Sequence, residues 1–204
     1  MIIAVDGPSA AGKGTIARAI AAKLGFHFLD TGSLYRMVGL QVLRDRKSAE
    51  DKDHAVSVAK SLDPTKYFDG DLRSEKVAAI TSEIAQIPEL RSVLLEFQRE
   101  FSKRLPGAVL DGRDIGTVVC PDAEVKLFIT ASPEVRTRRR YEELLGRGDQ
   151  VRFADILADV HARDTRDAAR TLVACDAIVI DTSNLSVDQG VSKALSVVRT
   201  RIPV

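Results

Sequence analysis

Residues 2–15 read Ile2-Ile3-Ala4-Val5-Asp6-Gly7-Pro8-Ser9-Ala10-Ala11-Gly12-Lys13-Gly14-Thr15. An apolar run of strand length leads into a glycine-bounded loop, and the loop opens an alanine-rich helical stretch that ends near Leu24. This order is typical of a phosphate-binding P-loop, because the loop N–H groups and the helix dipole converge on one anion site. Lys13 adds a positive charge for the outer phosphates. We therefore predict that Gly7 to Thr15 bind a polyphosphate.

The residue after the lysine departs from the common P-loop pattern, which has Ser or Thr there to contact magnesium. Here Gly14 intervenes and Thr15 follows, a form that resembles the P-loop of nucleoside monophosphate kinases. Asp111 closes the apolar run 108–110, where a P-loop fold places a carboxylate near the magnesium. The candidate metal-site residues are therefore Thr15 and Asp111, acting directly or through water.

The composition argues against several function classes. The chain has 204 residues and a formal net charge of +1, from 30 basic and 29 acidic residues, so it offers no electrostatic footprint for nucleic acid. No run reaches the roughly 18 apolar residues that a membrane span needs, and the sequence begins directly with the predicted strand rather than a leader. We expect a cytoplasmic monomer with neither a membrane nor a nucleic-acid partner.

The cysteines and histidines offer no site of their own. Cys120 and Cys175 are far apart in apolar surroundings, which favours buried thiols over a disulfide. His27, His54 and His161 form no cluster, so we expect no histidine metal site and no nucleophilic triad.

Alternating apolar strands and helices predict an α/β fold. After the first strand, further strands are expected at 26–30, 108–111, 124–130 and 177–181, with helices in the gaps. This alternation predicts a three-layer P-loop fold, with a central parallel sheet and a site at the carboxyl ends of its strands. Ser33 is the predicted cap of the helix that follows the second strand.

The domain organisation follows from the same pattern. We expect one P-loop domain over residues 1–204, with a small lobe inserted at about 60–104. Apolar positions at helical spacing predict two helices in this lobe, divided at Pro88.

Residues 111–114 place two acids around an arginine at the carboxyl end of a predicted strand. Such charges are costly to bury unless ligands or partners compensate them. Together with the P-loop, the segments 29–36 and 111–119, and the arginine-rich stretches 131–140 and 163–170, they resemble the bacterial cytidylate kinase family. The matching motifs follow the order of that family over nearly the whole chain.

The resemblance implies an enzyme that moves the terminal phosphoryl group of ATP to CMP, and to dCMP, with Mg²⁺ as a cofactor. It implies that Lys13 serves the ATP phosphates and that Arg36 and Arg113 hold the acceptor phosphate. The implied acceptor-binding residues are Thr31, Arg36, Ser82, Arg91, Arg113, Asp114, Arg163, Asp167 and Arg170. The lobe between about 65 and 73 is shorter than is usual for the family. This difference affects the expected shape of the lobe and not the expected chemistry.

The residues assigned to the base are chemically suited to cytosine. Cytosine presents an exocyclic amino donor beside ring and carbonyl acceptors, so its reader needs a carboxylate and donors. Asp114 with Ser82, Arg91 and Arg170 forms such a set. Uracil has a carbonyl oxygen in place of the amino group, so Asp114 disfavours the alternative, a P-loop kinase for UMP.

The helix around residue 138 is predicted to belong to a lid at about 133–150. Arg138 and Arg139 each have a glutamate four residues on, the pattern of ordinary surface pairs. Arg136 and Arg140 are like charges at that spacing and should repel, although Arg140 can also reach an acid three residues on. A transferring phosphoryl group would relieve this repulsion, which favours Arg136 and Arg140 as catalytic lid residues.

A nucleotide-binding switch is the alternative from a different class. Switches that respond to GTP usually carry an Asn-Lys-x-Asp guanine reader, and this tetrapeptide does not occur in the chain. A nucleic-acid-binding module is weaker still, because the net charge is close to zero.

Overall fold

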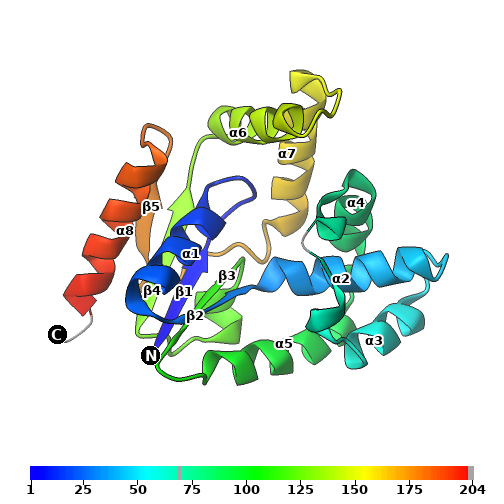
Figure 1. The fold of residues 1–204 in the computed structure, drawn as a ribbon, viewed down its shortest axis with the longest axis horizontal. Coiled ribbons are helices and arrows are strands. Elements are labelled where there is room, and N and C mark those ends of the chain that lie inside the picture. The colour runs from blue at the N-terminus through cyan, green and yellow to red at the C-terminus, as the bar shows by residue number, and fades with distance from the viewer. Residues whose placement is uncertain (69, 202–204) are drawn as a thin grey trace. The chain divides into compact units, whose positions relative to one another are not determined.

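The protein is described by a computed structural model that covers residues 1–68 and 70–201 (Figure 1). The strands of the described residues form one sheet in the order β2-β3-β1-β4-β5. Their bounds are β1 Ile2–Asp6, β2 His27–Asp30, β3 Ala108–Gly112, β4 Val125–Thr130 and β5 Ile178–Asp181. The main helices are α1 Lys13–Leu24, α2 Thr31–Arg44, α3 Lys52–Lys60, α4 Glu75–Ile84, α5 Pro88–Ser102, α6 Pro133–Gly146, α7 Phe153–Asp167 and α8 Val187–Arg201.

The sheet confirms the predicted α/β class. Strand β1 lies at its centre and pairs in parallel with β3 on one side and β4 on the other, and β4 pairs in parallel with β5. Helices α1 and α8 lie side by side along the sheet (Figure 1). Ile16 and Ile20 of α1 and Ala194 and Val198 of α8, spaced one turn apart on each helix, join the buried core. This packing fixes the carboxyl end of β1, from which the P-loop departs.

The chain divides into two compact units. The first comprises Met1–Leu29 and Ser102–Val204, and the second is Asp30–Phe101. The first unit holds the P-loop and most of the sheet, whereas the second consists of helices in which α2 packs against α3 and α4. The lobe at about 60–104 and the lid at about 133–150, which are functional divisions, stay predictions.

Two local expectations differ from the structure, and one element was not foreseen. The cap of α2 is Asp30 and not Ser33, because the strand ends on a carboxylate that accepts the Ser33 N–H at 3.1 Å. Ser33 lies inside the first turn, where its hydroxyl donates to the Asp30 carbonyl at 2.5 Å.

Both cysteines are free thiols, but only Cys120 is buried, and Cys175 is exposed in the turn before β5. A π-helix at Ile115–Val119 was not expected from the sequence.

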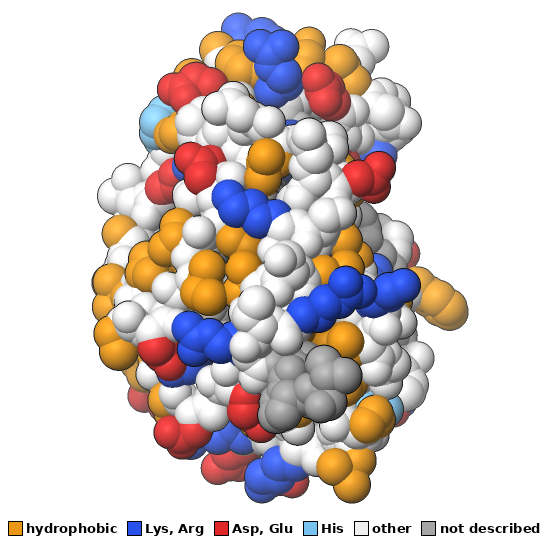
Figure 2. Space-filling view, turned by 90° about the vertical axis from the view of Figure 1, so that its left-hand side faces the viewer, with side chains coloured by type: hydrophobic (Ala, Val, Ile, Leu, Met, Phe, Trp, Pro, Cys, Tyr) orange, Lys and Arg blue, Asp and Glu red, His pale blue; other side chains and the backbone are white. Residues whose placement is uncertain are grey.

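Two general features bear on the choice of partners. Among the described residues, no helix combines the length and the apolar character that crossing a membrane would require. On the face drawn in Figure 2, basic and acidic side chains are interspersed rather than gathered into one basic surface.

Candidate functional site

The P-loop has a backbone that requires glycine at two places. Gly7 has a φ of +146°, and a Cβ there would lie 1.9 Å from the Ile129 carbonyl oxygen, so the chain can pass β4 only without a side chain. Gly12 has a φ of +88° and is the N-cap of α1, whose first turn has no acidic residue. The positive end of α1 is therefore not neutralised by a side chain of its own first turn, as an anion site requires.

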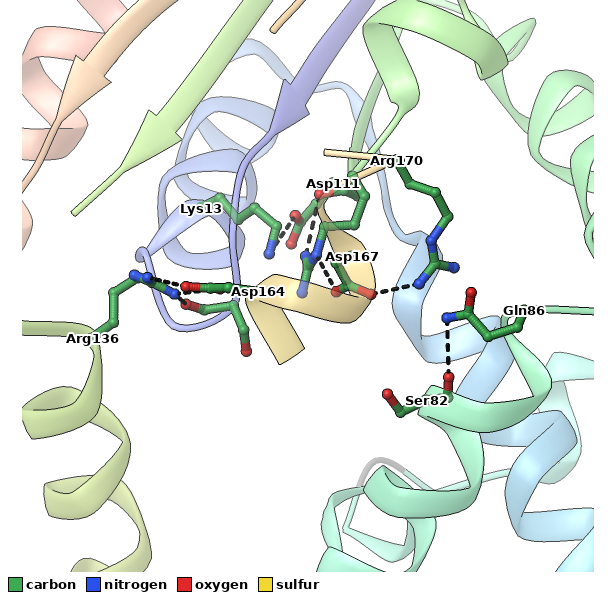
Figure 3. Close-up of polar contacts among 11 residues, drawn as sticks. Lys13, Ser82, Gln86, Asp111, Arg136, Asp164, Asp167 and Arg170 are labelled. Atoms are coloured by element: carbon green, nitrogen blue, oxygen red, sulfur yellow. Dashed lines mark hydrogen bonds and ion pairs between the residues drawn. The ribbon is translucent and has the colours of Figure 1, made fainter. Parts of the chain in front are cut away.

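Lys13 and Asp111 face each other at the start of α1 (Figure 3). The Lys13 amine lies 3.6 Å from an Asp111 carboxylate oxygen, and the two side chains are only 12% and 8% exposed. A Cβ at Gly14 would lie 3.0 Å from the other Asp111 oxygen. This close approach gives a physical reason for glycine after the lysine, where the common pattern has a hydroxyl residue.

The oxygen ligands at this point suit magnesium. Mg²⁺ in nucleotide enzymes usually has one or two carboxylate ligands and takes the rest from phosphates and water. Asp111 supplies a buried carboxylate beside Lys13, and Thr15 lies exposed in the first turn of α1. Groups of three or more His, Cys, Asp or Glu that could hold a metal by themselves are absent from the described residues. The residues therefore fit an ion that arrives with a nucleotide.

Asp6, the last residue of β1, is a buried carboxylate that the sequence analysis did not select. It is 5% exposed and accepts the N–H groups of Ile115 at 2.8 Å and Gly116 at 2.7 Å. Burial raises the pKa of the Asp6 carboxyl to about 6, although these two N–H groups lower it, and the charges of Asp114 and Asp111 raise it further.

One carboxylate organises two of the predicted acceptor arginines. Asp167, at the end of α7, accepts from Arg113 Nε at 3.2 Å and forms a further ion pair with Arg170 (Figure 3). Arg163 lies one turn earlier on α7, and Asp114 directly precedes the π-helix. Arg113, Asp167 and Arg170, which the resemblance assigns to one acceptor, are thus brought together within the first unit.

The second unit carries the other predicted acceptor residues. Thr31 is buried at the start of α2, and Arg36, one turn further along, forms an ion pair with Asp30. Ser82 belongs to α4 and Arg91 to the first turn of α5, so the two residues sit on consecutive helices.

The arginines of α6 differ from the expected arrangement. Arg136 and Arg140 were expected to repel each other unless a phosphoryl group lay between them. This is not the arrangement found: Arg136 is 3% exposed and forms two hydrogen bonds with the Asp164 carboxylate of α7, at 2.9 and 2.5 Å. Its Nη1 also donates to the Ser9 carbonyl of the P-loop at 3.3 Å. Arg140 pairs with Glu143 at 3.0 Å. Both arginines whose repulsion was inferred from spacing therefore have acidic partners in the protein, and the partner of Arg136 comes from another helix.

Arg139 was expected to form a surface pair with Glu143, and this is also wrong. It donates to the Ala11 carbonyl of the P-loop at 3.3 Å, to the Thr182 hydroxyl at 3.0 Å and to the Thr182 carbonyl at 2.8 Å. The Thr182 hydroxyl in turn lies 3.0 Å from the Ala11 carbonyl. Arg139 thus joins α6, the segment after β5 and the P-loop.

Comparison with known proteins identifies the family. The model of the family described as cytidylate kinase matches residues 3–200. The chain belongs to the cytidylate kinase family. A cytidylate kinase of Rhodospirillum rubrum is 47% identical over 205 residues, covering 97% of this chain and 96% of that protein. One of Cereibacter sphaeroides is 49% identical over 203 residues, covering 98% and 95%.

Solved structures agree with the fold of this cytidylate kinase family member. A shikimate kinase from Bacteroides thetaiotaomicron aligns with a TM-score of 0.52 and 16% identity over 98% of both chains. At this identity the likeness shows a shared fold and no more.

Sequence reasoning missed three side chains that contact the motifs of this family member. Asp6 could have been found, because it is an acid that closes an apolar strand, the signal that singled out Asp111. Asp164 and Arg139 gave no such signal. Asp164 lies 28 residues from Arg136, and Arg139 has a glutamate at the spacing of a surface pair.

Proposed function

We propose that the protein transfers the terminal phosphoryl group of ATP to CMP, and to dCMP, giving CDP or dCDP and ADP. The observation that carries this proposal is the P-loop with Lys13 set against Asp111, in a chain that matches the cytidylate kinase family from residue 3 to 200. Kinases for UMP are not favoured, since the curated relatives of high coverage are cytidylate kinases. That the enzyme is a cytoplasmic monomer stays a prediction.

The donor end is proposed to work through the P-loop. The loop N–H groups and the Lys13 amine hold the ATP phosphates, and Asp111, with Thr15, orients the Mg²⁺ region directly or through water. The ion, when bound with ATP, neutralises charge on the phosphates. Lys13 and Asp111 are both largely buried, so their charges act in a site with limited screening by water.

The acceptor end needs no general base. The attacking atom is a phosphate oxygen of CMP, and a second phosphate pKa of about 6 leaves it largely ionised at neutral pH. The remaining tasks are to align the two anions and to neutralise the transferring group. We propose Arg36 and Arg113 for the acceptor phosphate, and Arg140 and Arg136 of the lid for the transferring group, Arg136 acting while paired with Asp164.

The nucleoside of the acceptor is proposed to contact the remaining residues. Asp114 accepts the cytosine amino hydrogens, Ser82, Arg91 and Arg170 supply donors, and Thr31, Arg163 and Asp167 contact the rest of the nucleotide. The Asp167 carboxylate supports this assignment because it holds both Arg113 and Arg170. A bridging carboxylate restricts two long side chains at once, which reduces the entropy lost when the acceptor binds.

A coupled ADP-release assay across the common nucleoside monophosphates tests the proposed function. We expect CMP and dCMP to be turned over well and UMP poorly. Equal specificity constants for CMP and UMP would contradict the proposed selectivity, and turnover with none of the pyrimidine monophosphates would contradict the function itself.

The variant Asp114→Ala tests the base assignment. It should cost CMP about 1–3 kcal/mol of transition-state binding, the usual worth of a good contact to a base edge. The loss of transition-state binding should be far smaller for UMP, because uracil has no amino group that the Asp114 carboxylate could bind. The measurement is the ratio of kcat/KM for CMP and UMP, with Asp122→Ala, at an exposed acid, as the control. An unchanged ratio in Asp114→Ala would show that Asp114 does not read the base.

A further inference from the structure

The Asp6 carboxylate connects two distant parts of the first unit. Strands β1 and β3 are neighbours in the sheet (Figure 1), and the segment that leaves β3 turns back over the end of β1. There the two oxygens of Asp6 each accept one N–H, from Ile115 and from Gly116. The bonds span more than a hundred residues of sequence, so they fix tertiary geometry rather than a local turn.

These two N–H groups open the π-helix Ile115–Val119. The first N–H groups of any helix have no partner within it and need an acceptor from outside. The usual provider is the N-cap side chain, here Asp114, but its side chain makes no capping bond in the described structure. Asp6, which belongs to β1, therefore caps the π-helix in place of the Asp114 side chain.

Gly116 makes this arrangement possible. A Cβ at this position would lie 3.1 Å from Lys126 Cδ and 3.4 Å from an Asp6 carboxylate oxygen. The first distance is short for a Cβ contact and the second is at the edge of ordinary contact, so a side chain at residue 116 would press on the Lys126 stem and lie against the Asp6 carboxylate. Glycine at residue 116 thus leaves the approach of the backbone to Asp6 unobstructed.

We propose that Asp6 is a positioning residue for acceptor selection, because it fixes the backbone of the segment that carries Arg113 and Asp114. This inference rests on the proposed function, in which Asp114 reads the base and Arg113 holds the acceptor phosphate. Asp114 is joined directly to Ile115, so a rotation of the Ile115 peptide would move the Asp114 carboxylate. A displacement of about 1 Å at a binding group can cost a factor of about 100 in rate.

The chemistry requires a carboxylate at position 6. Two N–H donors point at one side chain, and only an ionised acid offers an acceptor to each of them. An asparagine of the same shape would accept from one donor and turn its own NH₂ toward the other. Burial and the charges of Asp111 and Asp114 disfavour the ionised carboxyl, and the two N–H groups favour it.

The test compares Asp6→Asn with wild type at pH 8. The control is Asp181→Asn, since Asp181 also ends a strand and accepts a backbone N–H, from Ser183 at 2.8 Å, but is exposed. We expect Asp6→Asn to lower the ratio of kcat/KM for CMP to that for UMP about tenfold or more, with an unchanged KM for ATP. Asp181→Asn should keep the wild-type ratio.

A double variant shows whether Asp6 acts through Asp114. If it does, Asp6→Asn with Asp114→Ala should have the same CMP to UMP ratio as Asp114→Ala alone, because the two changes remove one interaction. A further fall of the ratio in the double variant would overturn the inference. So would an equal rise of the KM values for ATP and CMP in Asp6→Asn, which would place its effect on the P-loop.

Gly116→Ala disturbs the same contact without changing a charge. It should also lower the CMP to UMP ratio, and it replaces Asp6→Asn as the deciding variant if the latter does not fold. If the wild type prefers CMP and the folded deciding variant has the same CMP to UMP ratio as the wild type, the positioning role alone is overturned. A wild type that does not phosphorylate CMP would overturn the proposed function and the positioning role together.

Discussion

The P-loop and helix α6 contribute charge to the same region of the first unit, but they are built in different ways. Residues 7–15 are one contiguous stretch, and their conformation is set locally by Gly7 and Gly12. The arginines of α6 are contiguous in sequence yet have unrelated partners. Arg136 pairs with Asp164 of α7, whereas Arg140 pairs with Glu143 on its own helix. Neighbouring arginines on one helix therefore need not share their partners.

The two regions also meet. Arg136 and Arg139 donate to the carbonyls of Ser9 and Ala11, both at 3.3 Å. These carbonyls lie in the loop whose N–H groups are proposed to bind phosphate. Arginines that bond the carbonyl side of the loop would hold the loop in shape while its N–H groups bind the anion. We therefore expect the P-loop to supply the anion site, and Arg136 and Arg139 of α6 to keep the loop rigid.

The largest effect is expected at the loop itself. Lys13→Ala should lower kcat by about 10²–10³-fold, the usual cost of removing one preorganised donor from a developing charge. The matched control is Lys23→Ala, at an exposed lysine in the last turn of the same helix, which should leave kcat unchanged. Steady-state kinetics of both folded variants measure this. Equal activity of Lys13→Ala and wild type would remove the loop from the mechanism.

The same contrast explains what could be predicted from the sequence. The P-loop and the buried strands were predictable because their signals, glycine spacing and apolar runs, lie within a few residues. The partners of Arg136 and Arg139 were not, because Asp164 and Thr182 reach them only through the fold. Spacing on a helix reports neighbours on that helix alone.

The second prediction concerns the buried ion pair of α6. Arg136→Ala should lower the free energy of unfolding by about 3 kcal/mol, near the lower end of the range for a broken buried pair, because the remaining Asp164 can still reach water. The Asp164 side chain is 32% exposed. Arg140→Ala should cost about 1 kcal/mol or less, since Arg140 and Glu143 form a more exposed pair. Urea unfolding of both variants checks the difference, and equal losses would contradict it.

The third prediction concerns the acid that precedes the P-loop. The pKa of Asp6 is raised from 3.8 to about 6, so between these values the folded state binds more protons than the unfolded state. Its contribution to stability is therefore fully present below pH 3.8 and is lost as the pH rises through 6. The loss amounts to about 2–3 kcal/mol.

The variant Asp6→Asn lacks this titration. Its free energy of unfolding, minus that of wild type, should rise by about 2–3 kcal/mol between pH 4 and pH 7, because only wild type is destabilised over this range. The measurement is urea unfolding at several pH values without nucleotide or Mg²⁺, so that no bound ligand contributes to the pH dependence. A difference that stays constant with pH would show that the Asp6 pKa is not raised.

The smallest effect is expected where the two regions join. Arg139 bonds the Ala11 carbonyl and both oxygens of Thr182, and hydrogen bonds from a charged donor contribute about 1.5–3 kcal/mol each. The Thr182 hydroxyl keeps its own contacts with Ala11 and Thr130 when Arg139 is removed, so the total loss should be near the lower end of the range for a single such bond. Arg139→Ala should therefore cost about 1.5–2 kcal/mol of stability.

Kinetics of this variant decide whether the junction serves the anion site. If Arg139 keeps the loop in shape, Arg139→Ala should raise the KM for ATP while the KM for CMP stays near that of wild type. Arg139→Lys should bring the KM for ATP little closer to that of wild type, because an ammonium cannot reach three acceptors as a planar guanidinium does. The control is Arg138→Ala, at an exposed neighbour on the same helix. Equal KM values for ATP in Arg139→Ala and Arg138→Ala would show that α6 does not shape the P-loop.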